Sequence, residues 1–557
     1  MTIEGGPMAG GGAADWIFYG GAIHPMDGTA ATSALAVRSG RVVALGGDAH
    51  DLRGPRTQAV DLRGGALLPG FQDAHVHAVA GGLQLLGCDL SGVHERDAYR
   101  ALVAAYAERH PGLEWIQGSG WYGDVFPGGF PHREDLDTVV PHRPVVLTSH
   151  DFHGVWVNSE ALRRAGVTAA TPDPEGGRIH RGADGEPTGL LVEAAAGLVT
   201  SLVPPPDAAR LDAALMAAQS HLHRLGITAW QDAAVGRSVL FDDSYDTYLS
   251  AAGSGRLTAK VTGALWWRGD EGLAQLGFLR ERRRRAGGRF RATAVKIMQD
   301  GVCENHTAAL LSPYRGLGQE TGLSFIPPGE LAEAAACLVA DGFDLHLHAV
   351  GDRAVRECLD AVEAALPNAG GRAARHQLAH LDLIDRGDID RMKRLGVIAN
   401  VQPLWAREDR VLVETKLPYL TDDQRARHFA FGSLARAGVE LAMGSDWPVS
   451  SPDPLWGIHV AVNRTAPPAD VHAGDEHAQT VPLLPGEAVG VRAAVHGYTA
   501  GAALANRMEH DSGTLTAGKA ADLVLLDGDP FAVGPRDLSS LRVRATFADG
   551  VPVHEAW

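Results

Sequence analysis

Cysteine is scarce in this chain, which has four such residues among 557. Cys88, Cys303, Cys337 and Cys358 are widely spaced and form no C-x-x-C pair. This spacing argues against both a disulfide framework and a cysteine-based zinc site, and it is typical of a reducing compartment. We therefore expect a cytoplasmic protein.

Long apolar runs are also missing. No segment approaches the roughly 18 uncharged apolar residues that a membrane-spanning helix requires, so we expect no membrane partner. Residues 1–14 are rich in glycine and alanine and lack the basic start and apolar centre of a signal peptide. We predict that this N-terminal segment is disordered.

Basic residues are outnumbered, with 50 Lys and Arg against 67 Asp and Glu and a formal net charge of -17. Negative charge opposes binding to nucleic acid or to an anionic membrane, so neither is an expected partner. The hydrophobic share of 45% is that of an ordinary globular protein. A chain of this length accommodates one large barrel and a smaller domain.

The most informative stretch runs from Leu67 to His77. An apolar segment leads through a Pro-Gly turn into the pair His75 and His77, two positions apart. If the segment after the turn is a strand, both imidazoles lie on one face, where they can share a metal ion. Such pairs are common, so the interpretation depends on what the rest of the chain supplies.

Both ends of the chain contain short apolar segments separated by glycine. These segments fall within 15–68 and 508–557, and each is typical of a short β-strand. Because chain ends often meet in compact proteins, we predict one composite β-sandwich domain built from both termini. The larger domain, residues 69–507, is then inserted between them.

From residue 226 onward, short apolar strands alternate with helical patterns. Together with the strand of His75 they number eight, and alternation of this kind predicts an α/β fold with a closed, TIM-like (β/α)8 barrel. The other seven candidate strands are 227–230, 259–264, 294–298, 344–348, 375–380, 397–401 and 440–446. The mixed segment 85–225 reads as an inserted α+β segment that covers the site.

Residues that can bind metals occur at the ends of five of these strands. In a (β/α)8 barrel the chemistry lies at the C-terminal ends of the strands. Taken singly, each residue is more often a helix cap or a core residue, but six in barrel order indicate a metal site. The six are His75, His77, Lys296, His348, His380 and Asp446.

Four other histidines fit a metal site poorly. His221 and His223 occupy what reads as a helix end, where side chains two positions apart diverge. His346 lies one pleat deeper than His348, and His376 also lies deeper in its strand than His380, so we predict supporting or core roles for both.

Several motifs along nearly the whole chain resemble the amidohydrolase superfamily, and within it the branch that includes N-substituted formamide deformylases. The segments that carry the resemblance are 69–77 (PGFQDAHVH), 153–162, 295–301 with 307–314, 348–354, 444–449 (GSDWPV) and 513–524. The last segment is typical of the composite β-domain in this superfamily.

The resemblance implies a site with two divalent metal ions, usually zinc. His75, His77 and Asp446 would hold one ion, and His348 and His380 the other. Lys296 would bridge them as a carbamate formed with CO2, which suits a buried lysine that loses its proton easily. A protonated, unmodified Lys296 cannot bind a metal, so a one-metal site stays open. Analogy with relatives suggests a homodimer.

The resemblance also implies hydrolysis of an amide-type C–N bond in a small molecule. The metals would hold the attacking hydroxide, and Asp446 would carry the proton to the leaving nitrogen. His153 is the predicted donor to the oxyanion, with Tyr122 behind it. The predicted pocket residues are Glu304, Asn305, Trp121, Trp405 and Trp447.

Three alternatives remain at this point. The same site could hydrolyse cyclic amides or N-acyl amino acids, with Arg353 or Arg407 holding the carboxylate of the latter. A one-metal deaminase is disfavoured by Lys296, because such enzymes lack the bridging lysine. A barrel that only binds or senses a ligand is disfavoured by the complete set of six ligands.

Overall fold

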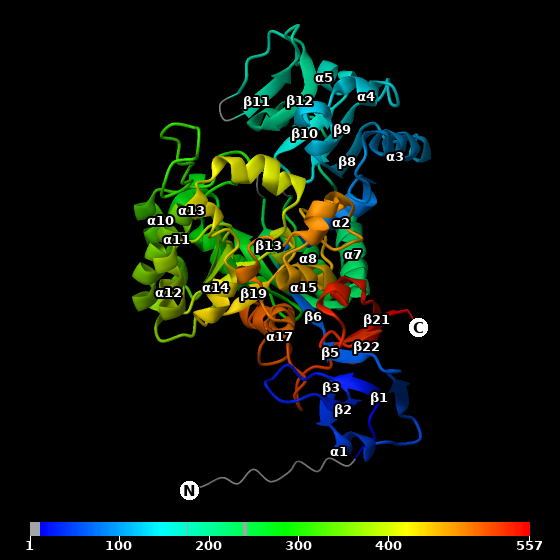
Figure 1. Ribbon diagram of the computed structural model, residues 1–557. Helices are drawn as coiled ribbons and strands as arrows, with labels where there is room; N and C mark the ends of the chain where they lie inside the picture. Colours follow the sequence, from blue (N-terminus) through cyan, green and yellow to red (C-terminus); the bar gives the residue numbers. More distant parts are fainter. Residues whose placement is uncertain (1–11, 175–176, 238–241, 557) are drawn as a thin grey trace.

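The computed structural model describes residues 12–174, 177–237 and 242–556. Three β-sheets divide the described chain: a central barrel, a sheet built from both termini, and a sheet in the inserted segment. The terminal sheet and the inserted sheet lie at opposite ends of the barrel (Figure 1). None of the described helices combines the length and apolar character that a bilayer crossing needs.

Eight parallel strands form the barrel and pair in chain order. The last strand returns to the first, because Asp446 N donates to His75 O and His77 N donates to Trp447 O, both at 2.8 Å. Every predicted strand is present, which confirms the barrel. The strands are β6 (Phe71–Val76), β13 (Ile227–Val235), β14 (Lys260–Trp266), β15 (Phe290–Met298), β16 (Asp344–Ala349), β17 (Gln377–His380), β18 (Ile398–Val401) and β19 (Leu441–Met443).

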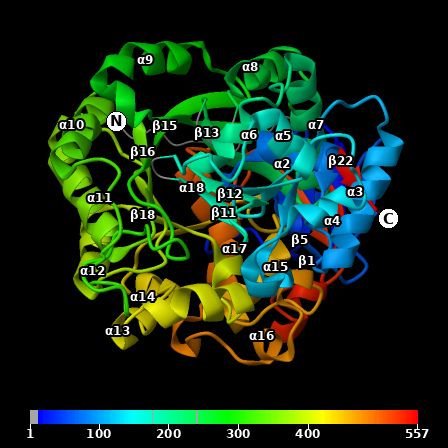
Figure 2. The ribbon, with the colours of Figure 1, turned by 90° about the horizontal axis from the view of Figure 1, so that it is seen from above.

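Helices surround these strands (Figure 2). In β16, Leu345 and Leu347 belong to the cluster between strands and helices, whereas His348 lines the cavity at the barrel end. The period-two alternation of a strand produces this division. The helices of the barrel region are α2 (Ala78–Leu86), α7 (Ala208–Arg224), α8 (Tyr245–Gly253), α9 (Leu276–Arg285), α10 (Pro328–Ala340), α11 (Asp352–Ala365), α12 (Arg386–Leu395), α13 (Asp422–Arg425), α14 (Phe431–Arg436), α15 (Pro454–Asn463), α16 (Glu476–Thr480), α17 (Val491–His496) and α18 (Ala502–Ala505).

Strands from both ends of the chain lie in one eight-stranded sheet. The two ends meet where β20 pairs with β5 in antiparallel fashion, and Phe18, Leu523 and Phe547 share one apolar cluster. The elements are β1 (Trp16–Ile23), β2 (Thr32–Arg38), β3 (Arg41–Leu45), α1 (Gly47–His50), β4 (Gln58–Asp61), β5 (Ala66–Pro69), β20 (Leu523–Leu526), β21 (Val543–Ala548) and β22 (Val551–Glu555).

The predicted disorder of residues 1–14 is wrong at the C-terminal end of that segment. Ala14 is buried, and its N–H donates to Leu52 O at 2.8 Å, because it packs beneath the terminal sheet. Residues 1–11 lie outside the described part of the chain.

The inserted segment has a six-stranded sheet and apolar clusters of its own. It is shorter than the predicted 85–225, because α7 packs against α2 and β13 and so belongs to the barrel. The elements are β7 (Cys88–Asp89), α3 (Arg96–Arg109), β8 (Ile116–Trp121), α4 (Arg133–Asp137), β9 (Val145–Ser149), β10 (Gly154–Val157), α5 (Ser159–Ala165), β11 (Gly177–Arg181), β12 (Pro187–Glu193) and α6 (Gly197–Thr200).

Candidate metal centre

Residues at the C-terminal ends of the barrel strands line a cavity. The inserted segment lies over this end of the barrel (Figure 1). The turn 150–153 of that segment forms part of the cavity wall. All six predicted ligands line the cavity, and each is at most 9% exposed. The fold therefore collects in one place residues that the chain supplies one strand at a time.

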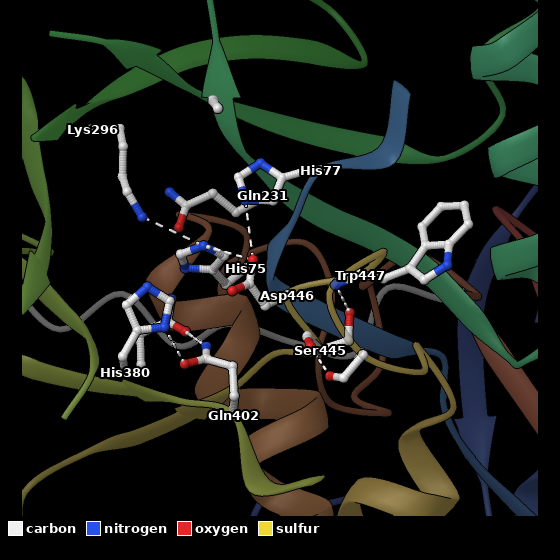
Figure 3. Close-up of polar contacts among 12 residues, drawn as sticks. His75, His77, Gln231, Lys296, His380, Gln402, Ser445, Asp446 and Trp447 are labelled. Carbon is white, nitrogen blue, oxygen red and sulfur yellow. Dashed lines mark hydrogen bonds and ion pairs between the residues drawn. The ribbon is translucent and has the colours of Figure 1, made fainter. Parts of the chain in front are cut away.

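His75, His77 and Asp446 form the tightest part of this group (Figure 3). Oδ1 of Asp446 lies 3.0 Å from Nε2 of His77 and 3.4 Å from Nε2 of His75. One ligand atom from each residue lies within 4.8 Å of the other two. Two imidazole nitrogens and a carboxylate oxygen at this spacing can bind one divalent ion.

Lys296, His348 and His380 stand beside that trio. Nζ of Lys296 is 3.4 Å from Nε2 of His75. The ring of His380 has its centroid 4.9 Å from that of His75 and 4.3 Å from that of His348. Nε2 of His348 faces Gly301 O at 3.3 Å, so His348 must bind a metal through Nδ1 or after a rotation of its ring.

A chain of hydrogen bonds orients His75. Nδ1 of His346 donates to Oε1 of Gln231 at 2.8 Å, so Nε2 of His346 accepts from Nδ1 of His75 at 2.9 Å. This arrangement leaves the Nε2 lone pair of His75 directed toward Asp446 and Lys296. The predicted supporting role of His346 is confirmed, whereas Gln231 was missed because an isolated buried glutamine carries no sequence signal.

His380 is oriented in the same manner, since its Nδ1 donates to Oε1 of Gln402 at 2.9 Å (Figure 3). His376 and His223 are buried in the core and contact none of the six ligand candidates. Nδ1 of His376 accepts from Leu345 N, and Nδ1 of His223 donates to Ile227 O.

Asp73 links the first and last barrel strands behind the site. Its carboxylate accepts hydrogen bonds from Oγ of Ser445 at 2.6 Å and from His75 N at 2.9 Å. Burial raises the pKa of Asp73 to about 7. These bonds fix the backbone on both sides of the trio, a role of Asp73 that no sequence pattern indicated.

Burial sets the protonation of the ligand set. It is the largest cause that lowers the pKa of His75 and His380 well below the ordinary value, the pKa of His348 to about 3 and the pKa of Lys296 to about 7. The imidazoles of His75, His348 and His380 are therefore neutral, which is the form that binds metals. Oδ1 of Asp446 is buried and accepts no hydrogen bond from any described residue. This donor set fits a divalent metal ion.

Several predicted pocket residues do line the cavity, namely His153, Tyr122, Glu304 and Trp405. The ring of Trp405 stacks on His380 with centroids 5.4 Å apart and an interplanar angle of 8°. The ring of Tyr122 stacks between those of His150 and His472.

Three pocket predictions are wrong. Trp121 is buried in the inserted segment against Trp156, with its indole N–H donated to Leu147 O. The ring of Trp447 points away from Asp446 (Figure 3). It packs against Gly81 of α2. Asn305 instead donates from Nδ2 to Glu193, outside the cavity wall.

A buried lysine was also missed. Nζ of Lys416 lies 2.9 Å from Asp382 and 3.0 Å from Glu304, and all three residues line the cavity. Lys416 ends the π-helical turn Leu412–Lys416, which no sequence pattern predicts. Because Asp382 and Glu304 neutralise the ammonium of Lys416, this lysine is not free to pair with a negatively charged substrate.

The barrel and its buried donor set define a metal-dependent hydrolase. Comparison with known proteins gives the same class, and the chain belongs to the amidohydrolase family, whose model matches residues 58–554. The protein is therefore a hydrolase that acts on C–N bonds.

Two curated relatives and one solved structure illustrate the similarity. The chain is 31% identical to the protein LONG AFTER FAR-RED 3 of Arabidopsis thaliana, covering 96% of this chain and 91% of that one. It is 27% identical to the N-substituted formamide deformylase of Arthrobacter pascens, with coverage of 94% and 95%. An uncharacterized metal-dependent hydrolase from Pyrococcus furiosus is 26% identical with a TM-score of 0.70, covering 92% and 99%.

Proposed function

We propose that the protein hydrolyses N-substituted formamides that carry an apolar N-substituent. The active form would hold two divalent metal ions, with zinc expected, and a carbamate on Lys296 between them. The similarity to the Arthrobacter pascens deformylase supports this substrate class. The observation that carries the proposal is the character of the cavity wall.

That wall is apolar beside the ligands, and its cations are neutralised. Lys416 is paired with Asp382 and Glu304. The ring of His153 is paired with Glu193. Besides Lys296 and Lys416, no lysine or arginine of the described chain lines the cavity. The apolar wall consists of Phe152, Trp266, Met298, Val302, Val350, Trp405, Val411, Leu412 and Val449.

The two arginines predicted to hold a substrate carboxylate are engaged elsewhere. Arg353 donates to Oγ of Ser324 and to backbone carbonyls. Arg407 is buried between Asp409 and Asp470. A substrate carboxylate in the cavity would lack a free cation, and burying an unpaired charge is costly. This disfavours N-acyl amino acids.

Lys296 is chemically suited to form a carbamate. It is 3% exposed, and burial lowers its pKa to about 7, so a large fraction of the amine is neutral near neutral pH. A neutral amine forms an N–C bond with CO2 and releases one proton. The product carries two oxygens, enough to contact two cations.

The side chains have distinct proposed roles. Bound metal would polarise the formyl carbonyl and lower the pKa of water. Asp446 faces His75 and His77, where it can accept a proton from the attacking water and pass it to the leaving nitrogen. His153 can donate to the developing oxyanion, and Trp405 offers a flat surface for an apolar substituent.

The test is a turnover assay on metal-loaded protein with a chelated control. The substrates are N-benzylformamide, N-benzylacetamide, an N-acyl amino acid and a cyclic amide, and the released amine or acid is measured. Chelator-sensitive release of formate alone is the expected result. Cleavage of the acetamide, the acyl amino acid or the cyclic amide instead would refute the formamide assignment. Bound metal without any turnover would favour a binding or sensing barrel.

A further inference from the structure

The turn 149–153 presents His153 to the cavity. Oδ1 of Asp151 accepts from Oγ of Ser149 and from His153 N, at 2.5 and 3.0 Å, which fixes the backbone of the turn. The side chain of His153 is 20% exposed and lines the cavity. Its Nδ1 is occupied by Glu193, which leaves Nε2 available to the cavity.

Glu193 is held on His153 from three directions. Oε1 of Glu193 lies 3.0 Å from Nδ1 of His153, and Glu193 N donates to His153 O at 2.9 Å. Nδ2 of Asn305 donates to the same Oε1 at 2.9 Å, so a barrel loop supports a residue of the inserted segment. Glu193 has φ 50°, a conformation that residues other than glycine rarely adopt. Strain of this kind concentrates at functional sites.

We propose that Glu193 is a positioning residue, which keeps the ring of His153 oriented and doubly protonated so that Nε2–H faces the reacting carbonyl oxygen. This inference rests on the proposed function, because it assigns a partner to the proposed oxyanion donor. Asn305 serves the same unit by fixing the carboxylate of Glu193, which explains why it lies outside the cavity wall.

The charges around His153 agree with this role. The titratable groups that face it are Asp151 of its own turn, Glu193 after β12, Glu304 of the loop after β15 and His348 of β16. Burial opposes the charged ring, but the hydrogen bond to Glu193 and the three carboxylates outweigh it and raise the pKa of His153 to about 9.

The first test compares Glu193→Gln with wild type on the substrate that the assay identifies. We expect kcat to fall by about tenfold or more, with KM changed by less than about twofold. The alkaline limb of the kcat profile should move to lower pH, because the glutamine removes the negative charge that stabilises the imidazolium. Glu160→Gln is the matched control, since Glu160 pairs with Arg163 and Arg164, exposed residues of the same segment.

A second measurement does not depend on turnover. Neutral imidazole reacts with diethyl pyrocarbonate, and peptide mass spectrometry follows this reaction at His153 across neutral to alkaline pH. Glu193→Gln and, more weakly, Asn305→Ala should make His153 reactive at lower pH than in wild type. Unchanged reactivity and an unchanged pH profile would overturn the proposal, and so would equal effects of Glu160→Gln. Failure of the formamide assay leaves this readout intact, so the two proposals fail separately.

Discussion

Replacing Gln231 by leucine tests how the fold prepares His75 for metal. The amide oxygen of Gln231 accepts from Nδ1 of His346, which in turn orients His75, and all three residues are buried. Leucine fills a similar volume but accepts no hydrogen bond. His346 then loses the preference for its present tautomer, and so does the ring of His75.

The expected loss can be bounded. Removing a partner that orients a metal-binding histidine typically weakens metal affinity by about 10–100-fold, or about 1.4–2.7 kcal/mol. The buried N–H that remains on His346 costs about 1–3 kcal/mol of stability, partly offset because Nε2 of Gln231 is itself buried with no hydrogen-bond partner in the described part of the chain. The fall in metal affinity should therefore be larger than the loss of folding stability alone would cause.

The assay is competition for zinc against a chromophoric chelator, together with thermal unfolding of the metal-free protein. Gln72→Leu is the matched control, because Gln72 is an equally buried barrel glutamine bonded to Ser512 and Asn506. It should lose stability and keep its metal affinity. Equal zinc affinity in Gln231→Leu and wild type would refute the reasoning about the orienting chain.

Three further outcomes are expected. Lys296→Met should reduce bound metal below the wild-type stoichiometry in elemental analysis, and full retention of metal would contradict the bridging role. Lys416→Met leaves the buried Asp382 and the partly exposed Glu304 as uncompensated carboxylates and should destabilise the protein by about 3–5 kcal/mol in denaturant unfolding, an outcome that an unchanged midpoint would exclude. Burial lowers the pKa of three core histidines from 6.5 to about 4, namely His223, His376 and His459. The unfolded chain therefore takes up protons before the folded chain does, and the Tm of the metal-free protein should fall as the pH falls from 6.5 toward 4. A Tm that stays constant over this range would show that the folded state does not resist protonation of these histidines.

Local pattern was sufficient to predict the barrel and the six residues that line the cavity at its C-terminal end. Period-two alternation separates Leu345 and Leu347 from His346 and His348, and the parallel barrel brings the strand ends together wherever the connecting helices lie. The deeper position of His346 in the same strand predicted a supporting role for it, and His346 is hydrogen-bonded to His75. For these features, position along a strand already fixes direction in space.

Tertiary structure alone decided the partners of these residues. Gln231 and His346 are 115 positions apart, and His346 and His75 are 271 positions apart, so nothing local pairs them. Trp447 and Trp121 looked like pocket residues, yet packing against Gly81 and Trp156 turned both into core. The sequence by itself determined which strands exist and which residues end them. Which side chain meets which, and with what charge, depended on how the layers pack, because contact and burial are properties of the folded chain.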